Sequence, residues 1–314
     1  MQANLDFITF AVAVIGPVIL MISFGYGLYR YGTLDDIFVE KASKLVFNFA
    51  LPALLFSTIS NSSVSQLANV KVISIGIGGT LLIFIAMLII VPFCIKSKND
   101  RGVVIQGSFR SNMGIIGLAY CANAYGSEGL AYGSVYLGGL TIVYNLLSVA
   151  VLNVFQNKAF SYAKIVKDIV TNPIILSILA GLIVSTMSIE MPAIIKNSAE
   201  YFAQLTLPLA LLCTGAALRF STMRQNGVAG LLSIAVKCII YPLTLVSIAL
   251  AFGINDMPLM VIFLMAISPT AAASYIMVRK IGGNHELAAQ IIAISTVLSV
   301  PFTLVGFSII TTLL

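Results

Sequence analysis

The sequence predicts an all-α polytopic membrane protein: ten transmembrane helices in two inverted five-helix repeats, with broken, crossing helices 4 and 9. Composition gives the class, because 59% of the 314 residues are hydrophobic and 9% are charged, whereas a soluble domain carries about 25% charged residues. Long apolar runs, among them 71–95 and 286–314, each reach the roughly 20 residues of a helical span. Prolines and glycines that recur at one fixed offset predict the repeat.

Ten apolar segments, separated by charged or polar stretches, are the expected spans. The first is expected to be a retained span rather than a signal peptide, because MQANLDF places no Lys or Arg before the apolar run. Thr33-Leu34-Asp35-Asp36 has the spacing of a capping box, so the helix of the second span is expected to begin well before the membrane. The expected ranges are 7–29, 43–60, 71–95, 103–121, 130–155, 171–188, 201–219, 228–252, 258–278 and 286–312.

The repeat rests on helix-breaking residues that match at an offset of 156 positions. The matching pairs are Pro17 with Pro173, Pro52 with Pro208, and Gly126 with Gly282. We therefore expect two domains, residues 1–157 and residues 158–314, with five spans in each. Since five is an odd number, the second half enters the membrane from the opposite side. Inverted repeats of this kind are common in secondary transporters.

Basic residues are distributed unevenly over the connections between the spans. With the N-terminus outside the cell, 13 lie on the cytoplasmic side and two, Lys71 and Lys196, on the outer side. This asymmetry predicts a multi-pass protein of the cell (plasma or inner) membrane with both termini outside. It also accounts for the net charge of +6 without a nucleic-acid partner. The 13 are Arg30, Lys41, Lys44, Lys96, Lys98, Arg101, Lys158, Lys164, Lys167, Arg219, Arg224, Arg279 and Lys280.

Two spans carry polar residues and breakers at matching places. SFRSNMGIIG, residues 108–117, falls by the same offset on the stretch around Pro269, with Asn112 matching Ser268. A proline inside a helix removes a backbone hydrogen bond and costs about 3 kcal/mol. We therefore expect both helices to be interrupted and to cross near the bilayer midplane, where half-helix N-termini suit a carboxylate. The candidate substrate-binding residues there are Arg110, Asn112, Met113, Gly114, Ser268, Pro269 and Thr270. The alternative is that Pro269 only kinks its helix and that the hydroxyl groups join neighbouring helices.

Two cations lie inside spans, where a charged side chain is costly. Arg110 and Lys237 have no Asp or Glu inside any expected span, so the predicted guest is an organic anion. Arg110 could instead extend towards the cytoplasmic face. Lys237 could bond helix-end carbonyls, or could replace a bound coupling ion as a fixed charge. Asn48 and Asn145 could each be a ligand or a packing contact.

The sequence offers no pattern of intramembrane catalysis. It has no paired intramembrane Asp, no HExxH and a single histidine, His285. The four cysteines form no CxxC pair. We therefore expect a protein that is not an enzyme and that needs no cofactor and no metal.

FRSNMGIIGLAY, FNFALPALLF and AAQIIAISTVLSVPFTL are similar to segments of the auxin efflux carrier family, which includes plant PIN proteins and bacterial organic-acid permeases. The resemblance covers nearly the whole chain. It implies a scaffold of helices 1, 2, 6 and 7, a transport domain of helices 3–5 and 8–10, and a homodimer in the lipid bilayer. It further implies that Asn112 contacts the substrate carboxylate and that Lys237 stands where relatives often have a basic residue.

The chain also departs from that family. Residues 156–170 form only a short connection, and no proline follows Gly117 in the fourth span. The third span lacks a carboxylate, so the proton linkage of some plant members does not transfer. The bacterial members suggest malate or malonate as substrate instead of auxin. The alternative is a sodium-coupled organic anion symporter of the bile-acid type, which would need a carboxylate near the break.

The charge asymmetry makes a testable prediction about topology. A reporter that is active only outside the cytoplasm should be active when it is fused after Leu314 and inactive when it is inserted in residues 96–101. A reporter with the opposite requirement serves as the control. A cytoplasmic C-terminus would contradict the inverted repeat.

Overall fold

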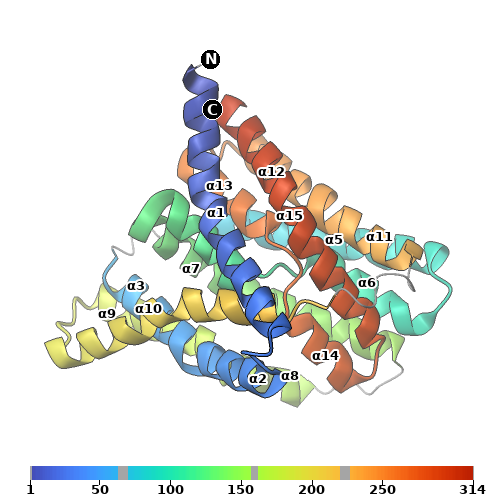
Figure 1. The fold of residues 1–314 in the computed structure, drawn as a ribbon, viewed down its shortest axis with the longest axis horizontal. Coiled ribbons are helices and arrows are strands. Elements are labelled where there is room, and N and C mark those ends of the chain that lie inside the picture. Colours follow the sequence, from blue (N-terminus) through green and yellow to red (C-terminus); the bar gives the residue numbers. More distant parts are fainter. Residues whose placement is uncertain (1, 63–69, 157–161, 220–226, 314) are drawn as a thin grey trace. The chain divides into compact units, whose positions relative to one another are not determined.

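The structure, a computed structural model, describes residues 2–62, 70–156, 162–219 and 227–313. Within these ranges the chain is helical, without a named strand (Figure 1). The helices of the first half are α1 (Gln2–Arg30), α2 (Asp36–Leu45), η1 (Val46–Ala50), α3 (Leu51–Ser60), α5 (Val70–Cys94), α6 (Lys98–Phe109), η2 (Met113–Gly117) and α7 (Leu118–Phe155). Those of the second half are α8 (Tyr162–Val170), α9 (Pro173–Thr186), α10 (Ala193–Ala216), α11 (Gly227–Ala235), η3 (Val236–Ile240), α12 (Tyr241–Ala251), α13 (Asp256–Ile267), α14 (Ala273–Ile281) and α15 (His285–Leu313).

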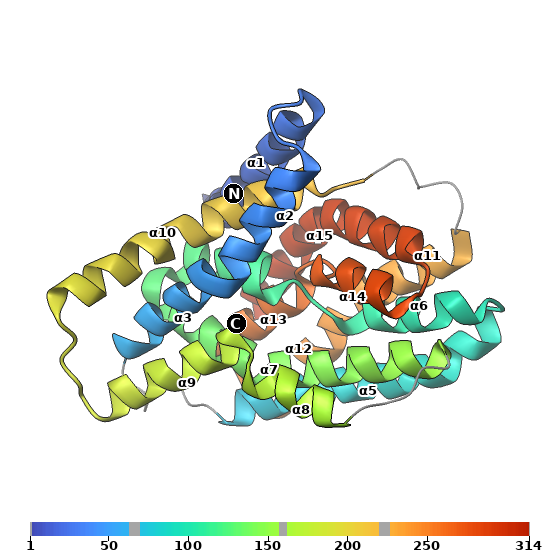
Figure 2. The ribbon, with the colours of Figure 1, turned by 90° about the horizontal axis from the view of Figure 1, so that it is seen from below.

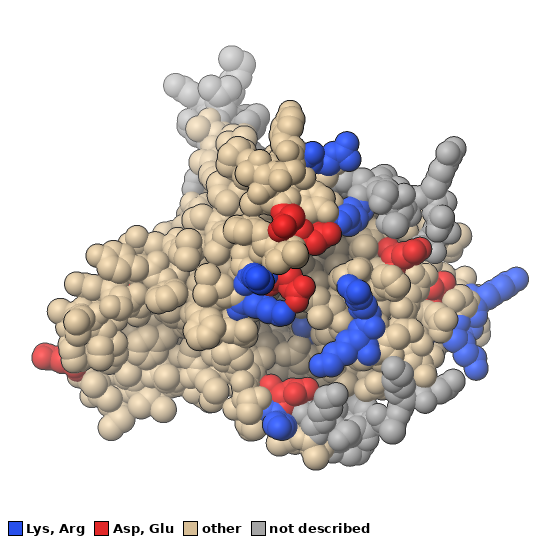
Figure 3. All heavy atoms as spheres, turned by 60° about the horizontal axis from the view of Figure 1, so that its bottom comes forward, with Lys and Arg blue, Asp and Glu red and all other residues tan. Residues whose placement is uncertain are grey.

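Six helical segments of the described residues are long and apolar enough to cross a membrane. The shorter helices α9 and α13 are also apolar. Much of the surface in Figure 3 carries no charged side chain, as a lipid-facing surface requires. The α-helical class is confirmed, whereas the number of ten crossings and their inverted arrangement stay predictions.

Local signals in the sequence act largely as expected. The helix of the second span begins at Asp36, before the apolar run, but its N-cap is Asp35, whose carboxylate accepts the Phe38 N–H at 2.7 Å. Gly126 and Gly282, one of the matched pairs, both have positive φ, at 58° and 101°. Glycine adopts this conformation without the steric penalty of a Cβ atom, so both positions can turn the chain between helices.

The chain forms two compact units. The first contains residues 1–70, 114–139 and 163–217, and the second contains residues 71–113, 140–162 and 218–314. These units are defined by contacts in space and not by the sequence repeat. The expected division into two repeats at residue 157 therefore stays a prediction.

Glycines bring helix backbones together inside the first unit. Figures 1 and 2 show α1 meeting α10, where a Cβ on Gly25 would clash with the Leu212 carbonyl and one on Gly215 with the Ile22 carbonyl. A Cβ on Gly181 of α9 would likewise lie 3.2 Å from the Phe56 carbonyl of α3. Small residues at such crossings are a common means of packing membrane helices.

The second unit is built around the two interrupted helices. In Figure 2, α6, α11, α14 and α15 lie side by side. Every residue from Leu259 to Thr270 is buried. The α13 helix therefore forms the core of this unit, and its interrupted end lies inside protein.

The close crossing of α1 and α10 gives a matched pair of variants. Gly25→Val should destabilise the protein by several kcal/mol, because the side chain meets backbone atoms that cannot move aside. Gly27→Val, on the same helix with nothing within 4 Å of its added Cβ, is the control and should be nearly neutral. The measurement is the thermal unfolding temperature of the purified protein in detergent. Equal effects of the two substitutions would contradict the packing described here.

Candidate functional site

Two helices of the second unit stop at the expected place and pair with each other. The α6 helix ends at Phe109, and α13 ends at Ile267. Ser111 and Thr270 then form an antiparallel bridge between the two extended stretches. The Asn112 N–H donates to the Pro269 carbonyl at 2.7 Å, and the Ala271 N–H donates to the Arg110 carbonyl at 2.9 Å. The expected interruption of both helices is confirmed. Backbone N–H and C=O groups freed by one interruption hydrogen-bond with those freed by the other.

Side chains of the two extended stretches also cap the helix ends. The stretch after α6 caps the end of α13, and the stretch after α13 caps the end of α6. The Ser111 hydroxyl donates to the Ala266 carbonyl of α13 at 3.1 Å, and the Thr270 hydroxyl donates to the Gly107 carbonyl of α6 at 2.9 Å. The Ser268 hydroxyl donates to the Leu264 carbonyl at 2.8 Å. The Ser111 and Thr270 hydroxyl groups therefore join the two helices, as the alternative predicted, whereas the Ser268 hydroxyl bonds the helix that precedes it.

Arg110 is buried at the break and does not extend towards the surface. Its side chain is 9% exposed. The guanidinium donates to the Asn145 amide oxygen at 2.8 Å and to the Ser148 hydroxyl at 3.0 Å, both on α7. Its Nε atom is buried without a hydrogen-bond partner. The alternative that Arg110 reaches the cytoplasmic face is wrong, and Asn145 makes a contact between helices by accepting from Arg110.

Lys237 is fully buried in η3 and bonds the end of a helix. Its ammonium donates to the Ala266 carbonyl at 2.5 Å and lies 4.9 Å from the centre of the Tyr241 ring. Ala266 belongs to the last turn of α13, where the helix dipole concentrates negative charge. A helix-end contact was one of the alternatives for Lys237, and the structure confirms it.

A chain of hydroxyl groups lies beside these cations, and the sequence alone did not predict it. Tyr144 and Tyr241 are 2.7 Å apart between their hydroxyl oxygens, and Tyr241 and Thr80 are 2.9 Å apart. Either hydroxyl of each pair can be the donor, and the Thr80 hydroxyl also lies 2.7 Å from the Gly76 carbonyl, to which it can donate. The chain links α5, α12 and α7 next to Asn145.

The remaining candidates divide between the two units. Asn112 is 5% exposed, and its side-chain amide makes no hydrogen bond to the described residues. Met113 is buried beside it in the second unit. Gly114 and Asn48 belong to the first unit, where Asn48 lies exposed in η1. The structure therefore brings together Arg110, Asn112, Met113, Lys237, Ser268, Pro269 and Thr270, and leaves the roles of Asn48 and Gly114 as predictions.

No carboxylate balances the two buried cations within the described residues. The acidic residues of the second unit, Asp100, Asp256 and Glu286, all lie in the first turn of a helix. The described chain has one ion pair, Lys44 with Glu40, and it is exposed. Arg110 and Lys237 are therefore held only by neutral groups.

Known proteins match this chain over most of its length. The chain is 24% identical over 284 residues to an "Uncharacterized transporter" of Methanothermobacter thermautotrophicus, with 90% of this chain and 92% of that protein covered. It is 28% identical over 273 residues to a "Putative malonate transporter" of Rhizobium meliloti, with 80% of each chain covered. The family described as membrane transport protein matches residues 10–306. The chain therefore belongs to the membrane transport protein family, that of the auxin efflux carriers.

Proposed function

We propose that this protein is a secondary transporter of small organic anions, carboxylates such as malate or malonate, and that it works by alternating access. Its substrate would bind at the crossing of the two broken helices, around Arg110 and Asn112. Membership of a transporter family supports the class, and the relative named for malonate supports a carboxylate. The inverted ten-helix repeat, the homodimer and the outward position of both termini belong to the same proposal.

The observation that carries the proposal is positive charge without a counter-ion. Arg110 and Lys237 are buried in one unit, and no acidic side chain of the described residues pairs with either. A buried charge without a partner is strongly unfavourable, and an anionic substrate would relieve that cost. The partnerless Nε of Arg110 and the amide of Asn112 supply hydrogen-bond donors for it.

The helix ends at the break add to the attraction for an anion. The α14 helix of the second unit begins at Ala273, so a helix N-terminus directly follows the stretch that contains Pro269 and Thr270. The C-terminal carbonyls of α6 and α13 accept hydrogen bonds from Thr270, Ser111 and Lys237. The negative helix ends are thereby occupied by protein donors, and the positive end of α14 would attract the substrate.

The geometry around Lys237 favours this proposal over sodium-coupled symport. A coupling cation would seek carbonyl oxygens at a helix C-terminus, and the Lys237 ammonium already donates to the Ala266 carbonyl there. The described acidic residues of the second unit lie at helix starts and offer no carboxylate for sodium. We therefore expect uptake to persist when choline replaces sodium in the medium. A strict need for sodium would favour the symporter.

Neutral replacements of the two cations test the anion site. Arg110→Gln and Lys237→Met should each lower carboxylate uptake into proteoliposomes at least about tenfold, because a hydrogen bond to a charged group contributes about 1.5–3 kcal/mol. Expression and melting temperature should change little. Lys41→Gln, which removes an exposed lysine, is the control. Loss of folded protein instead of uptake would show that the replaced cation serves folding.

Substitution of Asn112 tests where the anion binds. Asn112→Asp keeps the shape of the side chain and adds a negative charge, and repulsion at 4 Å is about 4 kcal/mol at an effective dielectric of about 20. Asn112→Asp should therefore abolish carboxylate uptake, whereas Asn112→Ser should retain part of it. Asn197→Asp adds the same charge at an exposed position of α10 and should leave uptake unchanged. Wild-type uptake by Asn112→Asp would exclude the crossing as the substrate site.

A further inference from the structure

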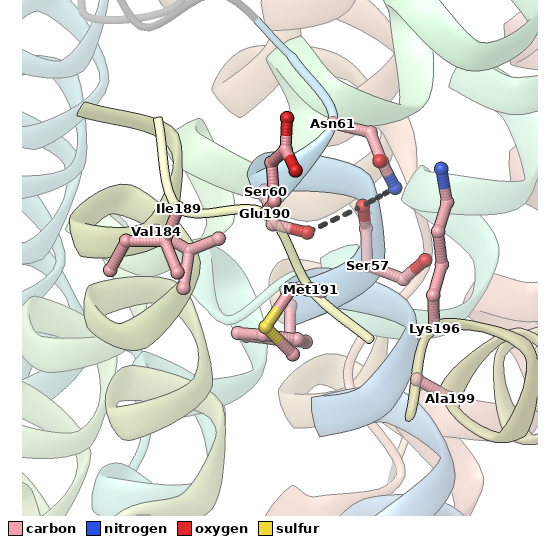
Figure 4. Close-up of a pocket in the computed structure, with 10 residues that line it drawn as sticks. Ser57, Ser60, Asn61, Val184, Ile189, Glu190, Met191, Lys196 and Ala199 are labelled. Atoms are coloured by element: carbon pink, nitrogen blue, oxygen red, sulfur yellow. Dashed lines mark hydrogen bonds between the residues drawn. The ribbon is translucent and has the colours of Figure 1, made fainter. Parts of the chain in front are cut away.

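A polar cavity lies in the first unit, and none of the residues of the break lines it. It has a volume of about 340 Å3 and is formed by the C-terminal ends of α3 and α9 and the first turns of α10 (Figure 4). Its polar residues are Ser57, Ser60, Asn61, Glu190 and Lys196. Phe56 and Met191 are among its apolar lining residues. The proposed transport mechanism assigns no role to any of these residues.

The walls of this cavity are fixed by backbone contacts. Gly181 lets α9 approach α3 closely, and the Ser185 hydroxyl donates to the Ser62 carbonyl at 2.5 Å. At the end of α9, Ser188 has a φ of 49°, and the Ile189 N–H returns to the Val184 carbonyl at 3.0 Å. This turn carries the chain directly to Glu190. The carboxylate is therefore attached to a defined turn at the mouth of the cavity.

The polar groups of the cavity are only partly used by the protein. The Ser57 carbonyl accepts from the Ser60 hydroxyl at 3.1 Å and from the Asn61 amide at 2.7 Å. The Asn61 amide oxygen, the Ser57 hydroxyl, the Glu190 carboxylate and the Lys196 ammonium make no hydrogen bond to the described residues. Donors and acceptors thus remain for a ligand.

The two charges of the cavity are opposite, and they do not pair with each other. In the view of Figure 4 the ends of Glu190 and Lys196 stand apart, with Asn61 between them, and no ion pair joins them. The charge distribution of the sequence predicts that this end of the unit faces outside, where Lys196 is one of two basic residues. A lysine on that side is an exception to the positive-inside trend. We therefore expect the charge of Lys196 to interact with a group bound in the cavity.

We propose that this cavity binds a zwitterion that carries a primary ammonium and a phosphate or carboxylate a few bonds apart. The ammonium would donate to Glu190 and to the Asn61 amide oxygen, and the anion would accept from Lys196 and the Ser57 hydroxyl. A phosphatidylethanolamine headgroup and a free soluble zwitterion share this chemistry. Glu190 repels a ligand with negative charge alone, so the site is distinct from a carboxylate transport site and stands without the proposed transport function.

The test uses the purified full chain in detergent and two kinds of probe. Native mass spectrometry measures which lipid is retained from an equal mixture of phosphatidylethanolamine, phosphatidylcholine and phosphatidylglycerol. Thermal shift measures the binding of soluble glycerophosphoethanolamine against glycerophosphocholine, whose quaternary ammonium donates no hydrogen bond. The variants are Glu190→Gln and Lys196→Gln. The matched controls are Glu200→Gln, exposed on α10, and Lys71→Gln, the other outer lysine, neither of which lines the cavity.

The wild type should prefer the ethanolamine form of at least one probe. Each cavity variant should weaken that binding about threefold to fivefold, the scale of one exposed ion pair, and each control should match the wild type. Preference for the lipid identifies a headgroup site, whereas preference for the soluble probe alone identifies a free zwitterion. Equal binding of the ethanolamine and choline forms, or cavity variants that bind like the wild type, would overturn the proposal.

Discussion

The structure of the second unit depends on one constraint: backbone groups freed by an interrupted helix must find partners where water is absent. Two interruptions meet this constraint together. The pairing of Ser111 with Thr270 satisfies backbone groups on both sides, and each of these residues also caps the helix end that precedes the other. Either break alone would leave N–H and C=O groups unpaired at a cost of several kcal/mol. The two breaks therefore stabilise each other, and neither half-helix can be understood alone.

The same arrangement orients the two buried cations, Lys237 and Arg110. The C-terminal end of α13 points its Ala266 carbonyl at Lys237, and the extended backbone at residue 110 directs a guanidinium to Asn145 and Ser148 on α7. The hydroxyl chain from Tyr144 to Thr80 ties the helices that carry these contacts to α5. Both cations are thus held by neutral dipoles, which orient them without cancelling their charge. The proposed anionic substrate would meet donors that are already oriented, and preorganised dipoles of this kind lose little energy on binding.

The features that the sequence could predict are those encoded within one segment. Pro269 marks the break in its helix by its own covalent structure, and the paired glycines Gly126 and Gly282 mark turns that require positive φ. The break at Arg110 has no proline, so it was predicted from the polar residues and glycines of SFRSNMGIIG and from their match to the stretch around Pro269 at the repeat offset. The partners of Arg110 lie 35 and 38 residues away, and those of Tyr241 lie 97 and 161 residues away. Such contacts depend on helix packing, which single-segment patterns do not contain, so the hydroxyl chain went unpredicted.

The crossing has a consequence for how carriers of this kind diversify. Its two backbone hydrogen bonds join the N–H of Asn112 and Ala271 to the carbonyls of Pro269 and Arg110, and they use no side-chain atom of positions 110 or 112. Most residue types can supply the same N–H and C=O groups in an extended stretch. Mutation can therefore explore new charges and shapes at positions 110 and 112 while the backbone junction persists. If the substrate binds where we propose, a few side chains at the crossing would set its identity, independently of the backbone that holds them.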